Sequence, residues 1–412
     1  MERKSIFYPS TRREFLRNSA HGIGLLTSYQ LVPSFFTYTN LTGSPSLAKD
    51  RKVIVLIQLV GGNDGLNTVV PLCDSNYFRL RPNLALTTKD LIPIGKNIAL
   101  NSALKQLADL HLDGKVSIIQ NVGYPNPNRS HFRSSEIWET ASDSDEFVST
   151  GWLGRYFDNH CTNRSSSDHP LAIHVGNQFP QTFRSTEPQI ISGSTREFPR
   201  SVRNNSVDQY GNFSTSETHG GNLKIPQHKL TKRGVTEEKI RFITEKYLPH
   251  IDYPQSRLSA DLRSVAALIV GGLETRVFFV SQSGYDTHTN QEKPHRRLLQ
   301  ELSSAMAAFQ KDLEANHLEN QVLTMTFSEF GRRPGENTSG GTDHGTSAPL
   351  FVMGGQIKKG IVGTAPSLAL DPTQDLQFST DFRQVYSTIL ENWFHCSSRH
   401  ILNRTFSPLD FV

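Results

Sequence analysis

Cysteine is scarce in this sequence of 412 residues, which contains only three. Cys73, Cys161 and Cys396 lie far apart along the chain. So few and so scattered thiols exclude a disulfide framework and a metal centre built from thiolates. One disulfide could form at most, and the spacing assigns no pair, so we expect isolated thiols.

An excess of charge of one sign is lacking as well, since the formal net charge is only +4. Most of that excess lies in residues 1–48, where five Lys or Arg residues stand against two acidic ones. The rest of the chain carries 38 basic and 37 acidic residues. The sequence therefore predicts no polybasic surface, and we expect no nucleic-acid partner.

Long hydrophobic runs are also missing after the N-terminal segment. No later stretch approaches the ~18 continuous apolar residues that a membrane-spanning helix needs, so we expect no transmembrane span in the mature chain. Hydrophobic residues make up 36% of the sequence and charged residues 20%. This composition is typical of a globular protein with a substantial core.

The N-terminal segment has the features of an export signal. The pair Arg12-Arg13 precedes an apolar Phe-Leu pair, and a moderately apolar stretch follows over residues 19–38. We predict that residues 1–48 are a twin-arginine signal peptide, read by the twin-arginine translocation machinery. The protein would then be periplasmic or extracellular. A basic amphipathic helix and an uncleaved membrane tether are the alternatives.

Several short apolar runs predict strands. The first, Val53–Val60 (VIVLIQLV), is almost wholly apolar and rich in β-branched residues, as in a strand buried on both faces of a parallel sheet. The other predicted strands are Lys115–Val122, Leu171–Val175, Arg276–Val280, Val322–Phe327 and Pro349–Met353.

Segments with helical spacing of apolar residues separate these runs. They begin near Ser102 and cover Phe132–Thr140, Ser259–Val270, Leu298–Leu313 and Asp381–Phe394. Strands that alternate with helices predict an α/β protein, with three α/β/α layers over residues 49–412 around a mostly parallel central sheet. Residues 181–232 are polar and aperiodic, and we interpret them as an irregular insertion.

Polar clusters stand beside the predicted strands. In open α/β sheets, ligands bind at the carboxyl ends of the strands. Oxygen and imidazole groups suit a hard or borderline divalent ion such as Zn²⁺, Mn²⁺, Mg²⁺, Ca²⁺ or Fe. The candidate residues are Asp64, Ser130, Asp286, His288, Glu329, Arg332 and Arg333 after strands, and Asp343 and His344 before the last strand.

Each candidate also has a structural explanation. Asp64 and Ser130 could cap helices or turns, and Glu329 could form a salt bridge with Arg332 or Arg333. The segment Asp286–His288 could be a plain loop, and His344 an exposed or capping histidine. Four other histidines are expected to be structural, with His295 the best reserve ligand: His131, His295, His317 and His395.

Five ordered segments carry a resemblance to a known family. They are GGNDGLNTVVP from Gly61, GYPNPNRSHF from Gly123, YDTHTNQ from Tyr285, FSEFGRR from Phe327 and GTDHG from Gly341. On these segments the chain resembles the exported family known as domain of unknown function 1501, within the alkaline phosphatase/sulfatase-like superfamily. The resemblance implies an alkaline phosphatase-like α/β/α fold.

The resemblance also implies an activity, the hydrolysis of phosphate or sulfate esters by an exported metal-dependent enzyme. Ser130 would attack phosphorus or sulfur. Arg129, or Arg332 with Arg333, would bind the anionic oxygens of the ester substrate. The metal shell would consist of Asp64, Asp286, His288, Glu329, Asp343 and His344. A non-catalytic envelope binding or assembly protein on the same scaffold is the alternative.

Two alignments with the superfamily pattern compete. In the first, Asp343-His344 is the superfamily's Asp-His pair. In the second, Glu329-Phe330 takes that place and His344 is the closing histidine. The second fits the strand order better, because the pair should follow a strand directly. It places Phe330 where a ligand histidine is expected, which predicts a weakened or missing second metal site.

Overall fold

The computed structural model describes residues 51–161, 169–176, 180–186 and 237–412. The predicted signal peptide lies outside the described residues, as does nearly all of the predicted polar insertion.

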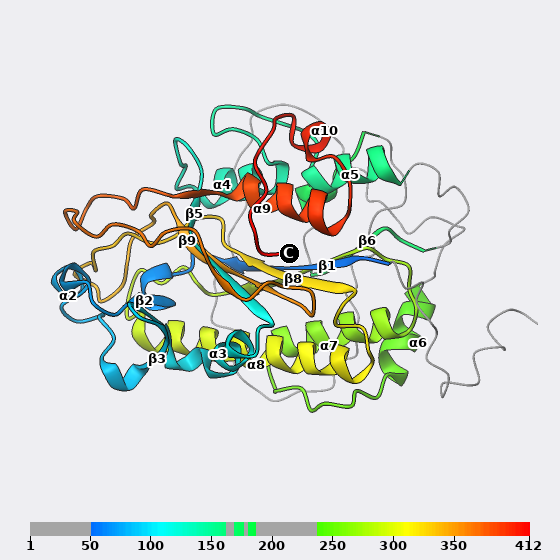
Figure 1. Ribbon diagram of the computed structural model, residues 1–412, viewed down its shortest axis with the longest axis horizontal. Coiled ribbons are helices and arrows are strands. Elements are labelled where there is room, and N and C mark those ends of the chain that lie inside the picture. The colour runs from blue at the N-terminus through cyan, green and yellow to red at the C-terminus, as the bar shows by residue number, and fades with distance from the viewer. Residues whose placement is uncertain (1–50, 162–168, 177–179, 187–236) are drawn as a thin grey trace, which may run out of the picture. The chain divides into compact units, whose positions relative to one another are not determined.

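Within the described residues, eight strands form one mixed sheet with helices on both faces (Figure 1). Seven of them follow one another across the sheet, and the short strand β11 (Thr380–Asp381) pairs beside them with β5. In spatial order the seven are β10 (Gly360–Val362), β5 (Val116–Gly123), β9 (Ala348–Met353), β8 (Val322–Phe327), β1 (Val53–Val60), β7 (Val277–Ser283) and β6 (Ala172–Val175). The six strands predicted from the sequence are confirmed, two of them to the residue.

Strand β9 runs against the direction of the others. It pairs antiparallel with both of its neighbours, β5 and β8, whereas the remaining pairings in this sheet are parallel. The start of β9 therefore lies at the sheet edge where β1, β5, β7 and β8 end. This reversal brings the GTDHG loop, which precedes β9, to the same edge as the residues that follow the parallel strands.

Helices cover both faces of the sheet and make three layers (Figure 1). On one face lie α3 (Lys105–Leu112), α6 (Glu237–Lys246), α7 (Arg257–Val270) and α8 (Glu292–Ala315). On the other lie α4 (His131–Thr140), α5 (Trp152–His160), α9 (Phe382–Thr388), which continues as a π-helix over Ile389–Trp393, and α10 (Ser398–Leu402). The predicted α/β/α fold class, with a mostly parallel sheet, is confirmed.

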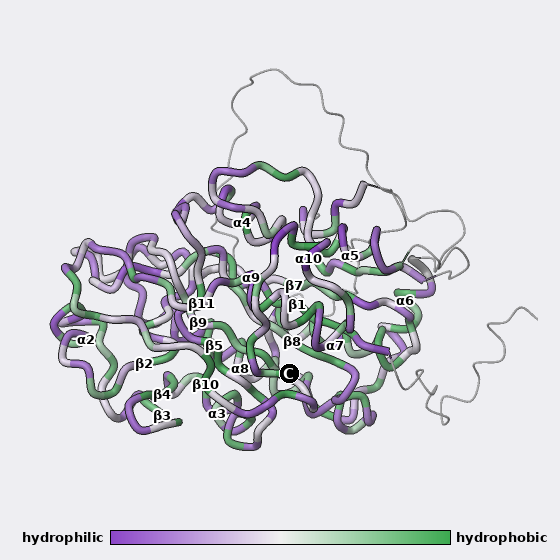
Figure 2. Tube along the Cα trace, turned by 45° about the horizontal axis from the view of Figure 1, so that its top comes forward, coloured by the Kyte–Doolittle hydropathy of each residue, from purple (hydrophilic) through white to green (hydrophobic). Residues whose placement is uncertain are grey.

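Alternating side chains of β1 build the two cores. Val53, Val55 and Ile57 pack with the apolar faces of α3, α7 and α8, while Ile54 and Leu56 pack with those of α4, α5 and α9. Both sets are buried, which explains why the strand is a continuous apolar run. In Figure 2 the central strands are accordingly hydrophobic.

A smaller sheet follows β1, and the sequence patterns did not predict it. Its three strands are β2 (Val69–Pro71), β4 (Ile98–Asn101) and β3 (Leu91–Gly95), all antiparallel. The short helix α2 (Ser75–Leu80) lies within this excursion, and Arg81 is its C-cap residue. Short 3₁₀ turns complete the described elements at Gly65–Asn67, Thr88–Asp90, Ser102–Leu104 and Gln181–Phe183.

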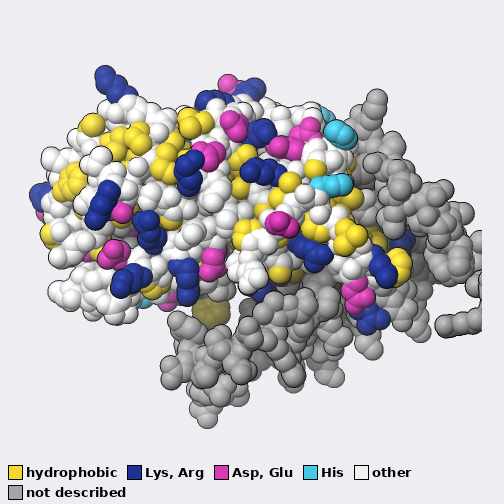
Figure 3. All heavy atoms as spheres, turned by 90° about the horizontal axis from the view of Figure 1, so that it is seen from below, with side chains coloured by type: hydrophobic (Ala, Val, Ile, Leu, Met, Phe, Trp, Pro, Cys, Tyr) yellow, Lys and Arg dark blue, Asp and Glu magenta, His cyan; other side chains and the backbone are white. Residues whose placement is uncertain are grey.

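None of the helices in the described part of the chain has the length and apolar character that crossing a membrane requires. On the face seen from below in Figure 3, Lys and Arg side chains are interspersed with Asp and Glu side chains.

Candidate metal centre

Three side chains converge at the edge where the parallel strands end. His131 is the first residue of α4, Asp286 follows β7, and His344 precedes β9. One potential ligand atom from each lies within 4.8 Å of the others. The parallel course of β5 and β7 and the reversed course of β9 together produce this cluster.

Asp286 is the centre of the cluster. His344 Nε2 lies 3.1 Å from Asp286 Oδ1, and His131 Nε2 lies 3.5 Å from Asp286 Oδ2. A third imidazole, that of His288, also places its Nε2 3.1 Å from Asp286 Oδ1. The Nε2 atoms of His288 and His344 are 2.9 Å apart. Three imidazole nitrogens thus gather around one carboxylate.

The opposite nitrogen of each ring faces a protein oxygen. His344 Nδ1 is 2.9 Å from the Arg129 carbonyl oxygen, and His131 Nδ1 is 2.9 Å from Glu329 Oε1. His288 Nδ1 lies 3.5 Å from Asp343 Oδ1. An acceptor at Nδ1 favours the tautomer that carries its proton there, which leaves the Nε2 lone pair free. Histidines that bind metals are commonly held in this way by a carbonyl or carboxylate.

Arg332 holds the Asp286 carboxylate in place. Its Nη2 donates to Asp286 Oδ1 at 2.6 Å, while its other donors go to backbone oxygens, among them those of Gly62 at 2.9 Å and Thr342 at 2.8 Å. The guanidinium is fully buried. Burial raises the pKa of Asp286, but interactions led by the hydrogen bond from Arg332 outweigh it and lower that pKa to about 2. The carboxylate is therefore ionised at neutral pH.

Glu329 contacts the His131 ring through its carboxylate. Its Oε1 accepts from the Gly61 backbone N–H at 2.8 Å as well as from His131. Its Oε2 is buried and has no hydrogen-bond partner among the described residues. The hydrogen bond to Glu329 raises the pKa of His131. Glu329 thus pairs with His131 and Arg332 with Asp286, so the alternative of a salt bridge between Glu329 and Arg332 does not form.

Asp64 forms a separate ion pair with Arg81. Arg81 Nη1 lies 2.6 Å from Asp64 Oδ2, and both side chains are fully buried. The Gln291 amide donates to the same oxygen. Burial raises the pKa of Asp64, but the Arg81 charge and hydrogen bond outweigh it, so that the pKa is lowered. The Asp64 carboxylate is therefore ionised, and the positive charge of Arg81 balances its negative charge.

Ser130 and Asp343 lie at the margin of the cluster. Ser130 occupies the N-cap position of α4, but its exposed hydroxyl makes no capping hydrogen bond. Asp343 is also exposed and contacts His288, and a hydrogen bond from Asn337 lowers its pKa. The structure thus brings Asp286, His288 and His344 together, with Asp343 and Ser130 beside them.

Phe330 follows Glu329 and is buried against the histidines. Its ring centroid lies 4.5 Å from that of His344 and 4.9 Å from that of His131. A phenyl ring offers no lone pair to a cation. The position after β8 therefore contributes packing to the cluster and no ligand.

Sequence reasoning missed two residues of this region. His131 was expected to be structural, although it directly follows the candidate Ser130 in the polar segment after the predicted strand Lys115–Val122, a position that could have identified it. No pattern pointed to Arg81, because it belongs to the unpredicted excursion between β1 and β5.

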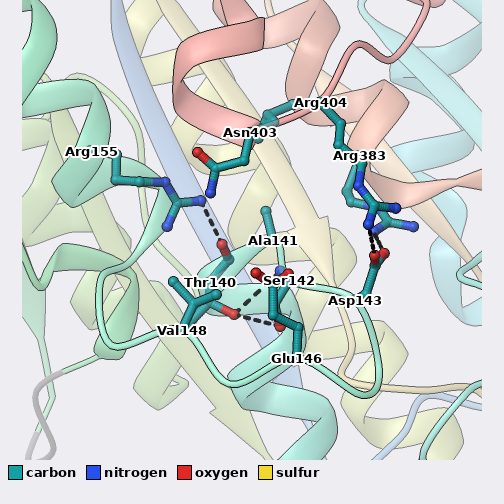
Figure 4. Close-up of a pocket in the computed structure, with 11 residues that line it drawn as sticks. Thr140, Ala141, Ser142, Asp143, Glu146, Val148, Arg155, Arg383, Asn403 and Arg404 are labelled. Atoms are coloured by element: carbon teal, nitrogen blue, oxygen red, sulfur yellow. Dashed lines mark hydrogen bonds and ion pairs between the residues drawn. The ribbon is translucent and has the colours of Figure 1, made fainter.

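A hollow of about 160 Å³ lies elsewhere, among the end of α4, α5, α9 and α10 (Figure 4). Its arginines are already paired: Arg155 donates to the Thr140 carbonyl oxygen at 2.7 Å, and Arg383 and Arg404 both pair with Asp143. This hollow contains no histidine of the cluster, and the chemistry is concentrated at the strand ends.

The fold and the strand-end cluster define an α/β/α protein with a candidate metal centre. The family described as "Protein of unknown function (DUF1501)" matches residues 115–401, more than half of the chain, and the chain belongs to this family. None of the curated proteins matches its sequence.

Several solved structures resemble the chain weakly. The C-terminal periplasmic domain of EcEptC from Escherichia coli, in complex with Zn, is 9% identical, with 76% of this chain and 75% of that chain covered and a TM-score of 0.36. A Vibrio parahaemolyticus protein in the alkaline phosphatase superfamily is 12% identical (76% and 62% covered, TM-score 0.35).

Lipooligosaccharide phosphoethanolamine transferase A from Neisseria meningitidis, an integral membrane protein, is 9% identical, with 84% of this chain and 55% of that chain covered and a TM-score of 0.37. The chain therefore spans less than two thirds of this protein and of the Vibrio protein. The fold class rests on the chain's own topology.

Proposed function

We propose that this protein is an exported, metal-dependent hydrolase of phosphate or sulfate esters. The observation that carries the proposal is the set of three imidazoles whose Nε2 atoms surround the Asp286 carboxylate while each Nδ1 faces a protein oxygen. Export by the twin-arginine route is proposed from the N-terminal sequence alone.

The donor set fits a divalent ion. Asp286 and His344, which the sequence predicted, together with His131 would hold it. His288, which the sequence also predicted, lies beside them, 3.1 Å from Asp286 Oδ1 and 2.9 Å from His344 Nε2, and Asp343 would orient it. Imidazole nitrogens and a carboxylate oxygen are ligand types that catalytic zinc sites use, and three protein ligands would leave a position open for substrate. When bound, the ion would supply positive charge to the ester oxygens. Glu329 would orient His131 and remain outside the ligand set.

Ser130 is the proposed nucleophile. Its exposed hydroxyl precedes His131 at the N-terminal end of α4, where the helix dipole favours an anion. Arg129 and Arg333 are the proposed contacts to anionic ester oxygens, which would replace Asp375, their partner at 3.2 and 3.6 Å. Arg332 differs from the sequence expectation in its proposed role, because its guanidinium is already bonded to Asp286 and to backbone oxygens.

Elemental analysis of the purified protein tests the metal site. We expect one divalent ion per wild-type chain and less than a tenth of an equivalent in Asp286→Ala and in His288→Ala. His400→Ala, at an exposed histidine on α10, is the matched control and should keep its ion. Unchanged metal content in both site variants would refute the assignment.

Chromogenic phosphate monoesters, phosphate diesters and sulfate esters test the activity, with Ser130→Ala as the catalytic control. We expect turnover of one class, lost in Ser130→Ala without loss of the metal. A protein inert to all three classes after metal addition would favour the alternative, a non-catalytic exported envelope protein. Phe330 and the pairing of Asp64 with Arg81 favour that alternative, because they remove groups that a two-metal site would use.

A further inference from the structure

We infer that Arg81 takes the place of a second metal ion at Asp64, so that the site binds one divalent ion per chain. This inference rests on the proposed metal-dependent function. It concerns which positive charges balance the carboxylates at the same edge of the sheet. Its starting point is that three neighbouring strands, β7, β1 and β8, each end in a carboxylate: Asp286, Asp64 and Glu329.

Hydrogen bonds hold the Arg81 guanidinium in a fixed position beside Asp64. Its Nε donates to the Pro334 carbonyl oxygen at 2.8 Å and its Nη2 to that of Arg333 at 3.0 Å. Its Nη1 serves both Asn67 Oδ1 at 3.0 Å and Asp64 Oδ2. A guanidinium stays protonated in proteins, and this one is fully buried. Asp64 therefore has a permanent cationic partner.

The groups around Asp64 offer few further ligands to an ion. Phe330 follows Glu329 with a carbon ring, and the nearby imidazole of His295 is 3.0 Å from Asn63 Oδ1 through its Nε2. Burial lowers the pKa of His295 to about 4, so that it adds no charge of its own. Asp64 Oδ1 lacks a hydrogen-bond partner among the described residues, as does Glu329 Oε2 after the neighbouring strand β8. A carboxylate beside a fixed positive charge is a poor cation site, because the guanidinium repels a second cation.

The double variant Asp64→Asn/Arg81→Met tests the inference, because it removes both buried charges together. We expect it to keep one ion per chain, with an affinity within about threefold of the wild type by isothermal titration with Zn²⁺. Arg81→Lys, which retains a positive charge, should give the same count. Circular dichroism establishes that each variant is folded, and Arg81→Lys carries the test should the double variant fail to fold.

The outcomes separate this inference from the proposed function. Two ions per wild-type chain, or loss of the ion in a folded double variant, would overturn the role of Arg81 while leaving a metal-dependent enzyme. A second ion in Arg81→Lys would overturn it as well. A wild-type chain that binds no Zn²⁺ would overturn both. One ion in all three proteins, and none in Asp286→Ala, supports both.

Discussion

Asp286 depends on a single buried cation for its position at the centre of the imidazole cluster. Arg332 donates to it at 2.6 Å, and every neighbouring acceptor of that guanidinium is a backbone oxygen. The side chain contacts the cluster through Asp286. Its loss should therefore alter how well the site is preorganised more than which ligands it has.

We expect Arg332→Gln to weaken Zn²⁺ binding by about 10- to 100-fold, because Asp286 loses its anchor. Isothermal titration of folded protein measures the effect, and Arg332→Lys should recover part of it. Arg297→Gln, at an exposed arginine on α8, is the matched control. An unchanged affinity in Arg332→Gln would contradict the positioning role.

At this scale the sequence predicted the residues that follow strands directly. Asp286 and His288 were identified because an apolar run ends just before them. His131 was passed over because a lone histidine at a helix start is usually structural, and only the fold brings it near Asp286. Arg81 could not be predicted, since its partner Asp64 is reached through a local excursion without a periodic pattern.

The reversal of β9 is the element that completes the cluster. Its apolar run predicted a strand but not its direction, because periodicity is the same for both directions. The connection from β8 to β9 contains no helix, whereas parallel neighbours need a long crossover. Within that connection the backbone at Gly331 packs closely against the backbone at Ser347. A Cβ on Gly331 would fall inside contact distance of the Ser347 backbone oxygen.

Gly331→Ala should accordingly destabilise the fold by about 1–3 kcal/mol, because the loop before β9 must move to admit a methyl group. Zn²⁺ affinity should fall with it, since His344 moves with that loop. Urea unfolding and titration measure the two effects. Gly360→Ala, where no atom lies within 4 Å of the added Cβ, is the matched control. Equal stability of the two variants would argue against the close approach.

Strand β6 carries a buried histidine that makes stability depend on pH. His174 is buried beside Phe279, and its Nδ1 has no hydrogen-bond partner among the described residues. Burial lowers the pKa of His174 to about 4. The unfolded chain, with a histidine pKa of about 6.5, binds the proton more readily, so stability is lost as the pH falls from that value toward the folded pKa.

Between pH 7 and pH 5 this histidine should lower the free energy of unfolding by about 2 kcal/mol. Urea unfolding of metal-free wild type and His174→Leu at the two pH values measures it as the difference between their losses. His174→Leu should show a correspondingly smaller loss, whereas His400→Leu should behave as the wild type. The same pH dependence in His174→Leu and wild type would mean that the imidazole is protonated in the folded state.

For the whole molecule, metal binding and folding should be coupled. The cluster draws on residues from α4, from the loop after β7 and from the loop before β9, so only the folded chain can offer all of them. Free Zn²⁺ at about 100 times its Kd should add about 2.7 kcal/mol to the free energy of unfolding. Thermal unfolding should show a higher Tm with Zn²⁺ for the wild type and no change for Asp286→Ala.

The three-layer architecture was predictable because β1, β8 and the helices between the strands have clear periodicity. The antiparallel excursion of β2, β3 and β4 was not, since its strands are only three to five residues long. Helices α5 and α10 were missed as well, each being ten residues or shorter. Local signals are weak in such segments, and packing against the rest of the chain decides their conformation.

The contacts of the cluster join parts of the chain that are very distant in sequence. His131 and Glu329 are 198 positions apart, and Arg129 and His344 are 215 apart. Contacts of this separation form late in folding, because a large loop must close before they gain anything. The appearance of Zn²⁺ affinity during refolding would therefore mark the completion of the fold, and a nascent chain could not acquire the ion until residue 344 had been synthesised.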